Sequence, residues 1–212
     1  HCWGDNGARE TGTGSIADNV LVPTPVLGLT GAIVSFALGY SFTCVLLVDQ
    51  TVWCWGRNEN GQVGRGTFTF REVTPAAVTG LGSALAVNAG SFHACARLVD
   101  GTVDCWGSNS GGKLGNDDTQ DSAVPVPVLG GYLFELLECG GIFTCALTAT
   151  ADRYCWGRNN YGQLGDGTTT DRHIPTLGPD PVALSGVAAG GYHACGLDGS
   201  GAVYCWGRNQ EG

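Results

Sequence analysis

Short apolar runs, each bounded by glycine, proline or polar residues, recur along the whole chain. No stretch repeats apolar residues with the 3.6-residue period of a helix over three turns. The longest apolar region, residues 32–48, is interrupted by Ser35, Gly39 and Ser41, and a membrane span needs about 20 predominantly apolar residues. The pattern therefore predicts two buried strands there, an all-β fold, and no membrane span in this segment.

A five-residue motif sets the spacing of these runs. Cys-Trp-Gly, any residue and then Asn occurs at intervals of 52, 51, 50 and 50 residues, beginning at Cys2, Cys54, Cys105, Cys155 and Cys205. A fixed period of about 50 residues is typical of repeat architectures, in which each repeat buries its apolar face against its neighbours.

Each repeat is predicted to form four short strands. They are expected at 32–38, 42–48, 51–55 and 73–78, then at 84–89, 93–99, 102–106 and 123–129, then at 133–139, 143–148, 153–156 and 173–177, and last at 182–189, 193–197 and 202–206. Four short antiparallel strands per repeat make one blade of a β-propeller.

The chain is accordingly predicted to be a single propeller segment over residues 1–212. It would comprise a partial blade at 1–29, blades at about 30–80, 81–130 and 131–181, and a partial blade at 182–212. Because both ends fall inside a repeat, we expect a piece of a longer array, truncated at both ends.

Eight of the ten cysteines form pairs ten residues apart: Cys44 and Cys54, Cys95 and Cys105, Cys145 and Cys155, Cys195 and Cys205. A three-residue hairpin loop such as 99–101 places the two members of a pair directly opposite each other, and the last loop position favours a left-handed residue such as Gly101 or Gly201. On a non-hydrogen-bonded pair the Cα atoms lie about 4.5 Å apart, which a disulfide accepts.

Two alternatives to disulfides are weaker. Zinc sites use close Cys-x-x-Cys spacings, which this chain lacks, and reduced core thiols would not explain four evenly repeated pairs. Disulfides indicate an oxidising compartment, so the predicted location is extracellular or at the cell surface. Cys2 holds the second position of a pair whose first member would lie upstream, and Cys139 is expected to be a buried free thiol.

The remaining motif residues are interpreted as structural. The tryptophans are bulky enough to fill the space between neighbouring blades, and the asparagines are expected to tie the following turn by side-chain to backbone hydrogen bonds. These residues are Trp3, Trp55, Trp106, Trp156, Trp206, Asn6, Asn58, Asn109, Asn159 and Asn209. Glycines at 39, 90, 140 and 190 end the first strand of each blade, where blades converge and only small residues fit.

Composition excludes one class of partner. The net charge is −9, and only ten Lys and Arg residues are present, none of them in a run. Nucleic-acid binding depends on clustered basic residues, so no nucleic-acid partner is expected.

The loop after the motif resembles a known family. Residues 156–168 read Trp-Gly-Arg-Asn-Asn-Tyr-Gly-Gln-Leu-Gly-Asp-Gly-Thr, residues 55–64 form a second copy, and residues 111–115 read Gly-Gly-Lys-Leu-Gly. This pattern is similar to the regulator-of-chromosome-condensation repeat and covers essentially the whole chain. The first repeat departs from it, because Arg9 and Glu10 stand where Gly and Gln are expected.

The resemblance implies a β-propeller, commonly of seven blades, of which about four are present. The family includes an exchange factor for the Ran GTPase that sits on chromatin, ubiquitin-ligase scaffolds and a secreted bacterial inhibitor of β-lactamase. The cysteine pairs and the acidity of this chain point instead toward a secreted, disulfide-containing branch.

Candidate chemistry is sparse. His93 and His193 share a strand position with Phe42 and Phe143, which favours a structural role. No nucleophile elbow, phosphate loop or zinc-protease motif occurs. Carboxylates gather at 117, 118 and 121, beside Asn116, but a solvated turn is favoured over a calcium site. No catalytic residue, cofactor or metal is therefore expected.

What differs between repeats is the loop after each Trp-Gly pair, and variable loops on a rigid scaffold are suited to binding. The sequence predicts a non-catalytic extracellular module for protein interaction or structure, with a protein partner or self-assembly. The alternatives are a secreted enzyme or enzyme inhibitor with a site on the propeller face, or a Ran-type exchange factor.

Overall fold

The computed structural model describes residues 1–179 and 183–210. All the regular elements in these residues are β-strands. Among them there is no helix that could cross a membrane. The strands are β1 (Cys2–Asp5), β2 (Asn19–Thr24), β3 (Ile33–Leu38), β4 (Phe42–Leu47), β5 (Val52–Arg57), β6 (Arg71–Ala77), β7 (Ala84–Ala89), β8 (His93–Leu98), β9 (Val103–Gly107), β10 (Ser122–Pro127), β11 (Phe134–Cys139), β12 (Phe143–Thr148), β13 (Arg153–Gly157), β14 (Arg172–Leu177), β15 (Leu184–Ala189), β16 (His193–Asp198) and β17 (Val203–Gly207).

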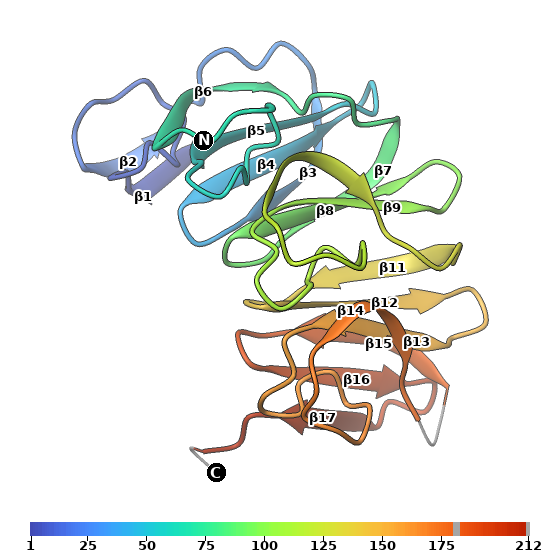
Figure 1. Cartoon of the computed structure of the whole chain (residues 1–212). Helices are drawn as coiled ribbons and strands as arrows, with labels where there is room; N and C mark the ends of the chain where they lie inside the picture. The colour runs from blue at the N-terminus through green and yellow to red at the C-terminus, as the bar shows by residue number, and fades with distance from the viewer. Residues whose placement is uncertain (180–182, 211–212) are drawn as a thin grey trace.

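The strands form separate antiparallel sheets in chain order. Three sheets have four strands each, β3 to β6, β7 to β10 and β11 to β14, while β15 to β17 form a three-stranded sheet and β1 pairs with β2 (Figure 1). Every pairing joins neighbours in sequence, so each sheet is a meander. The predicted all-β fold with four-stranded antiparallel blades is confirmed.

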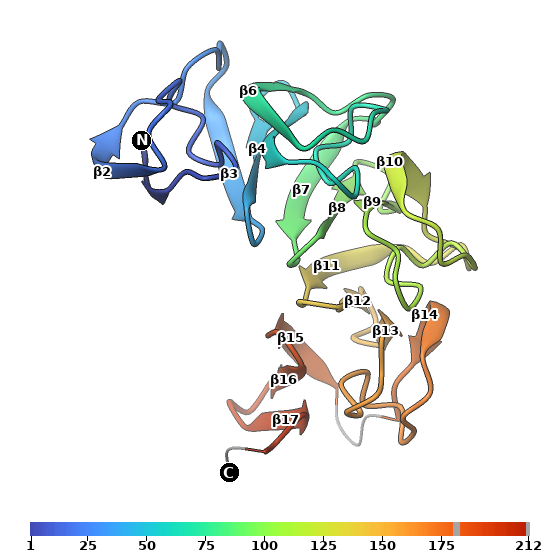
Figure 2. The same cartoon turned by 60° about the vertical axis from the view of Figure 1, so that its left-hand side comes forward.

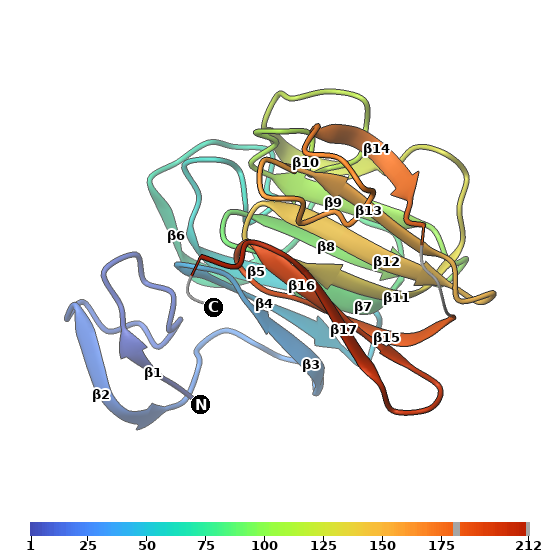
Figure 3. The same cartoon turned by 90° about the horizontal axis from the view of Figure 1, so that it is seen from below.

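The sheets follow one another along an arc. Figure 2 shows β3, β7, β11 and β15 on its concave side, with the later strands of each sheet farther out. Strands β3 and β4 contact β7, β7 and β8 contact β11, and β11 and β12 contact β15. In Figure 3 the β1–β2 pair lies at one end of this series, beside the sheet that begins with β3. This is the stacking of blades in a propeller.

The observed strands differ from the expected ones mainly at their ends. The third strand of each repeat continues through the Trp-Gly pair, because Gly56 still pairs with Phe42 and the Arg57 amide donates to the Ser41 carbonyl at 2.7 Å. In the partial blade at 1–29, the segment before the first full sheet is a strand only from Asn19 to Thr24. Val182, where one strand was expected to begin, lies outside the described residues, as do the blade limits proposed at 181, 182 and 212.

All four predicted disulfides are present: Cys44–Cys54, Cys95–Cys105, Cys145–Cys155 and Cys195–Cys205. Each pair lies directly opposite in its hairpin, with Cα atoms 4.0 to 4.2 Å apart. In the second hairpin Leu98 and Thr102 close a three-residue loop, and Gly101 has φ +87° as expected. Gln50 and Ala151 take this left-handed position in two other hairpins. A bridge closing such a short loop contributes about 2–3 kcal/mol to the stability of the fold.

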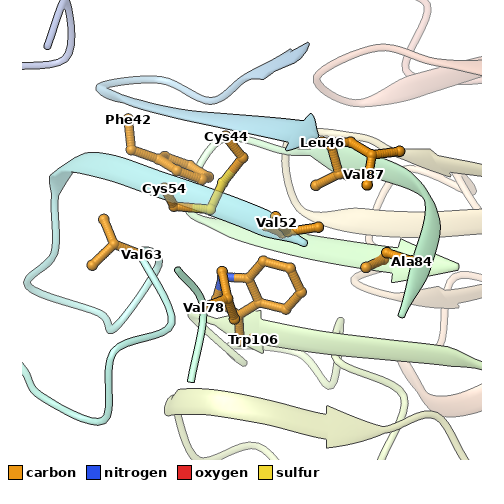
Figure 4. Packing of buried hydrophobic residues seen from close by; sticks show 12 residues of the cluster. Phe42, Cys44, Leu46, Val52, Cys54, Val63, Val78, Ala84, Val87 and Trp106 are labelled. Atoms are coloured by element: carbon orange, nitrogen blue, oxygen red, sulfur yellow. A yellow bond between two sulfur atoms is a disulfide. The ribbon is translucent and has the colours of Figure 1, made fainter. Parts of the chain in front are cut away.

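The hydrophobic core runs between sheets and not inside them. One cluster joins side chains of β4 and β5 to side chains of β7, β8 and β9, and it includes the Cys44–Cys54 disulfide and Trp106 (Figure 4). Figure 4 shows the Trp106 indole beside Val78. Two further clusters repeat this arrangement between the next sheets. Each sheet is therefore stabilised by its neighbours, as in other repeat proteins.

Glycine ends the first strand because space is lacking there. A Cβ atom on Gly39 would lie 1.9 Å from the ring of Phe42, and one on Gly90 would lie 2.2 Å from the Gly140 carbonyl oxygen of the next sheet. Both the ring at the start of the second strand and the adjacent sheet thus require glycine, in agreement with the predicted close approach of blades.

Candidate interaction face

Each motif tryptophan of the later repeats lies beneath the loop of the preceding repeat. Trp55, Trp106 and Trp156 are fully buried. The Trp55 indole nitrogen donates to the Glu10 carbonyl at 2.8 Å, and Trp106 makes the same bond to Gln62 at 3.0 Å. A loop glycine faces each ring; a Cβ on Gly12 would lie 2.5 Å from the Trp55 nitrogen. The indole therefore connects consecutive repeats.

The two terminal tryptophans differ from these three. Trp206 is partly buried and donates to the Gln163 carbonyl at 2.9 Å. Trp3 is 62% exposed. The sequence predicted that all five tryptophans pack between neighbouring blades. The structure places four of them against a preceding loop.

The motif asparagine organises the loop that follows it. The Asn159 side-chain amide donates to the Thr168 carbonyl at 3.0 Å, and its oxygen accepts from the Leu164 amide at 3.0 Å. Asn6, Asn58 and Asn109 make equivalent bonds to their own loops, and all four side chains are buried. Asn209 is exposed and, among the described residues, makes no such bonds. Buried polar side chains with satisfied partners fix one conformation.

The position two residues before the glycine that faces the tryptophan ring is also buried. Gln163 accepts from the Tyr161 amide at 2.8 Å through its side-chain oxygen, and Gln62 does the same for Asn60 at 2.9 Å. Lys113 takes this position in the third loop and is only 3% exposed. Burial lowers the pKa of Lys113 to about 8.

Two sets of connections meet at one end of the sheets, and we call their combined surface the loop face. It consists of the turns at 39–41, 90–92, 140–142 and 190–192 and the loops at 58–70, 108–121 and 158–171. The two sets lie side by side because the first loop amide bonds to the turn carbonyl, as from Ser108 to Phe92 at 2.8 Å and from Arg158 to Ile142 at 3.1 Å. The disulfide hairpin loops lie at the opposite end.

Arginine and aromatic side chains gather on the loop face in two places. Arg57 lies 5.7 Å from the centre of the Phe92 ring, which contacts Tyr40 at 5.6 Å between ring centres. Near the last repeat, Arg208 lies over Tyr161 and Tyr192 at 5.4 and 5.6 Å, and the two tyrosines meet edge to face, 5.7 Å apart. Tyr40, Tyr161 and Tyr192 are exposed. These clusters were not predictable from the repeat pattern, because their members come from different repeats.

Ion pairs stiffen the loops. Arg57 pairs with Glu59, and Arg172 donates to Asp166 at 2.8 Å. Burial alone would raise the pKa of Asp166, but hydrogen bonds from Thr168, Arg172 and Asn159 outweigh it and lower the pKa to about 2. The carboxylate is therefore charged throughout the physiological pH range.

The carboxylate cluster of the third loop is used to hold that loop together. Asp121 accepts from the Asn109 amide at 2.8 Å and from the Asn60 side chain at 2.8 Å. The Asn116 side-chain oxygen accepts from Asn109 at 3.0 Å, and Asp118 accepts from the amides of residues 119 and 120. These oxygens serve different parts of the loop and do not converge as calcium ligands do.

The histidines are dispersed. His93 is fully buried beneath Gly90 and shares a hydrogen bond of 2.9 Å with Thr144 of the next sheet, while His193 and His1 are exposed. Among residues 1–179 and 183–210, one group of three potential metal ligands has its ligand atoms within 4.8 Å of one another: His93, Cys95 and Cys139. Because Cys95 is bonded to Cys105, this group does not offer three free ligands.

Two further features carried no sequence signal. Arg153 stands where other repeats have valine, yet it is 2% exposed, donates to the Leu164 carbonyl at 2.6 Å and lies 4.3 Å from the Trp206 ring centre. A mainly apolar cleft of about 590 Å³ lies between the β1–β2 pair and the next sheet. Phe36 in this cleft is 69% exposed, whereas the equivalent Val87 is 7% exposed against the preceding sheet.

Comparison with known proteins agrees with this geometry. Two models described as the regulator of chromosome condensation (RCC1) repeat match residues 33–62, 85–113, 136–163 and 185–212, and residues 49–97, 100–147 and 153–197. The chain is 34% identical over 144 residues to the ultraviolet-B receptor UVR8 of Arabidopsis thaliana, which covers 65% of this chain and 32% of that receptor. The chain thus spans about a third of the length of this curated relative.

Two solved structures illustrate the similarity of the fold. Yeast RCC1 (Prp20), solved with Kap60, has a TM-score of 0.82 at 21% identity, covering 93% of this chain and 48% of that one. The CRINKLY WD40 ectodomain of the Arabidopsis thaliana receptor kinase ACR4 has a TM-score of 0.57 at 28% identity, covering 87% of this chain and 55% of that one.

Replacing Asn159 by Ala should lower the free energy of unfolding, because it leaves the Leu164 amide and the Thr168 carbonyl without their partner. We expect a loss of about 2–4 kcal/mol for two buried groups left unpaired. The matched control is Asn209→Ala, whose side chain is exposed and which should change stability by less than about 0.5 kcal/mol. Urea unfolding measures both, and equal effects would contradict the role given to the motif asparagine.

Acid stability should depend on His93. Burial, reinforced by the charge of Lys113, lowers the pKa of His93 well below its usual value. A lowered pKa in the folded state means that the unfolded chain binds the proton first, so stability is full above about pH 6.5 and falls as the pH decreases. This group should contribute a loss of up to about 1.4 kcal/mol per pH unit below that value.

The test compares unfolding free energies from pH 7 to pH 5 in three proteins. His93→Phe introduces the ring that Phe42 and Phe143 supply in other repeats, and it should remove this part of the acid loss. His193→Phe, at the equivalent exposed position, should retain it. An unchanged pH dependence in His93→Phe would show that His93 does not remain neutral in the folded state.

Proposed function

Since this chain belongs to the regulator of chromosome condensation (RCC1) repeat family, we propose that it is a protein-binding propeller segment that works outside the reducing cytosol and binds through its loop face. The observation that carries this proposal is the set of four disulfides, three of them fully buried, each joining the second and third strands of one of four successive sheets. The blades within it are proposed to span about 30–80, 81–130 and 131–181.

The disulfides support the proposed compartment. Disulfides form and persist in secreted and surface proteins and are rare in the cytosol. Each bridged cysteine of the first three pairs is fully buried, so the bridges belong to the packed core. The likeness to a receptor-kinase ectodomain supports the same location, since an ectodomain is outside the cell by definition.

The composition of the loop face supports binding to another protein. Tyrosine and arginine are among the residues that dominate the energy of protein interfaces, and both clusters combine them. Stacked arginine and aromatic rings are held in one arrangement before a partner arrives, which reduces the entropy lost on binding. Yeast Prp20 has been solved with Kap60, and its binding properties to Gsp1p and histones are described with another structure, which supports protein binding as a use of this fold.

We further propose that the chain has no catalytic site of its own. The buried His93 and the carboxylates of the third loop are held in structural hydrogen bonds. The exposed His193 has no nucleophile among its described hydrogen-bond partners, and catalysis needs a base within reach of a reacting group. An exchange factor that works on chromatin would need a basic face and reduced thiols, neither of which suits a chain of net charge −9 with four disulfides.

The compartment is tested on the chain isolated from its own source in the presence of a thiol-blocking reagent. In denaturant we expect Cys139 to be blocked and the eight cysteines of the four pairs to be protected until a reductant is added. Labelling of intact cells with a membrane-impermeant amine reagent should modify the chain. Ten reactive cysteines, or labelling only after lysis, would overturn the proposed compartment.

The loop face is tested by binding of the fluorescent chain to intact cells of the same source. Arg57→Ala and Arg208→Ala should each weaken saturable binding at least tenfold, which corresponds to about 1.4 kcal/mol. Arg97→Ala is the matched control, because it removes an arginine of β8 next to the opposite, disulfide-hairpin end. Equal affinity of all three variants would exclude the loop face, and a loss with Arg97→Ala alone would place binding at the other end.

A further inference from the structure

The free thiol of Cys139 lies next to the disulfide of the preceding sheet. Cys139 ends β11, at the position held by Leu38, Ala89 and Ala189 in the other repeats. It is buried and unbonded. Ala89 and Ala189 pack in clusters that contain the disulfide of the preceding sheet. In the repeats preceded by a bridged sheet this position therefore lies next to a disulfide, and only at residue 139 does it carry a sulfur.

The third sulfur is close enough to react. The sulfurs of Cys139 and Cys95 and a ring nitrogen of His93 lie within 4.8 Å of one another. Cys105, the bonded partner of Cys95, belongs to the same buried cluster but lies outside this group of three. Cys95 is therefore the bridge sulfur that lies within 4.8 Å of the Cys139 sulfur.

The neighbouring backbone holds this arrangement in register. Asn88 pairs with Cys95 in its own sheet and reaches across to the next. Its side-chain oxygen accepts from the Cys139 amide at 2.9 Å, and its side-chain amide donates to the Leu137 carbonyl at 3.2 Å. This clamp fixes the end of β11 against β7, so the approach of the two sulfurs is built into the contact between sheets.

We propose that the Cys95–Cys105 disulfide exchanges with Cys139 to give a second covalent form of the protein, with a Cys95–Cys139 bond and a free Cys105 thiol. The Cys139 sulfur, having lost its proton, attacks the Cys95 sulfur. The bond to Cys105 breaks, its electron pair goes to the Cys105 sulfur, and that sulfur takes up a proton. The number of disulfides is unchanged, so the step needs no oxidant or reductant.

The two forms differ in what they connect. The Cys95–Cys105 bond joins β8 to β9 within one sheet, whereas Cys95–Cys139 would join β8 to β11 of the next sheet, which lie in contact (Figure 1). The exchange would thus convert a bridge inside a repeat into a covalent link between two repeats. It would also move the free thiol to Cys105, in the cluster that holds Trp156.

Burial makes the exchange slow in the closed fold. Burial raises the pKa of Cys139, so the reactive thiolate is scarce. His93, kept neutral because burial lowers its pKa, places a ring nitrogen beside the thiol as a proton acceptor. We therefore expect exchange on the time scale of local opening between β8 and β11, which is faster than global unfolding.

The first test maps the disulfides of the intact, oxidised protein after incubation at pH 8.5, without reductant. The reaction is stopped with acid, free thiols are blocked with N-ethylmaleimide in denaturant, and unreduced peptides are identified by mass spectrometry. We expect a growing fraction of Cys95–Cys139 peptide and of blocked Cys105, both absent from Cys139→Ala, which carries the residue of the equivalent repeats. Blocking confined to Cys2 and Cys139 at all times, including in urea below the unfolding transition, would overturn the proposal.

The second test uses variants that remove either end of the native bridge. Cys105→Ser leaves Cys2, Cys95 and Cys139, and with oxidised glutathione as oxidant it should form Cys95–Cys139 and retain one free thiol. Cys95→Ser loses the same bridge but should retain three free thiols. Circular dichroism and thermal unfolding establish that each variant is folded, and free thiols are counted only in folded protein. Three free thiols in folded Cys105→Ser, or a bond between Cys105 and Cys139 in Cys95→Ser, would contradict the attack on Cys95.

Discussion

The indoles of Trp55, Trp106 and Trp156 are buried beneath a loop of the preceding repeat, and the spacing of the sheets depends on that contact. The ring needs a glycine above it, and the N–H groups of Trp55 and Trp106 donate to a carbonyl of that loop, as from Trp106 to Gln62. The loop can cover the ring only in the conformation that the buried asparagine imposes, as Asn58 does for the loop at 58–70. One repeat thus completes the core of the next.

The disulfides act within this arrangement and do not replace it. They join the second and third strands of one sheet, whereas the indole, the terminal glycines and His93 join one sheet to the next. Loops that are held from below by buried asparagines and buried tryptophans can vary at their exposed positions without loss of the fold. The loop face, with its arginine and aromatic clusters, is the surface through which we propose that the chain binds a partner.

The repeat period predicted most of the fold from sequence, because strands, hairpins and disulfides follow from local spacing. Cys95 and Cys105 could be paired by counting residues to the turn at Gly101. The clusters around Arg57 and Arg208 could not be predicted in this way, since they join residues of different repeats whose contact depends on the angle between sheets. Arg153, Lys113 and Cys139 were missed or left without a role because each differs from its equivalents, and a repeat pattern describes only what the repeats share.

The most direct test of this account is hydrogen exchange of the indole N–H groups, followed by NMR in the native state. The account predicts slow exchange for Trp55 and Trp106, which are buried and bonded to the preceding loop, and fast exchange for Trp3, which is 62% exposed. Protection of Trp106 should match that of the backbone amides of β8, because both open only when the sheets separate. Fast exchange of all three indoles would contradict the claim that tryptophan joins consecutive repeats.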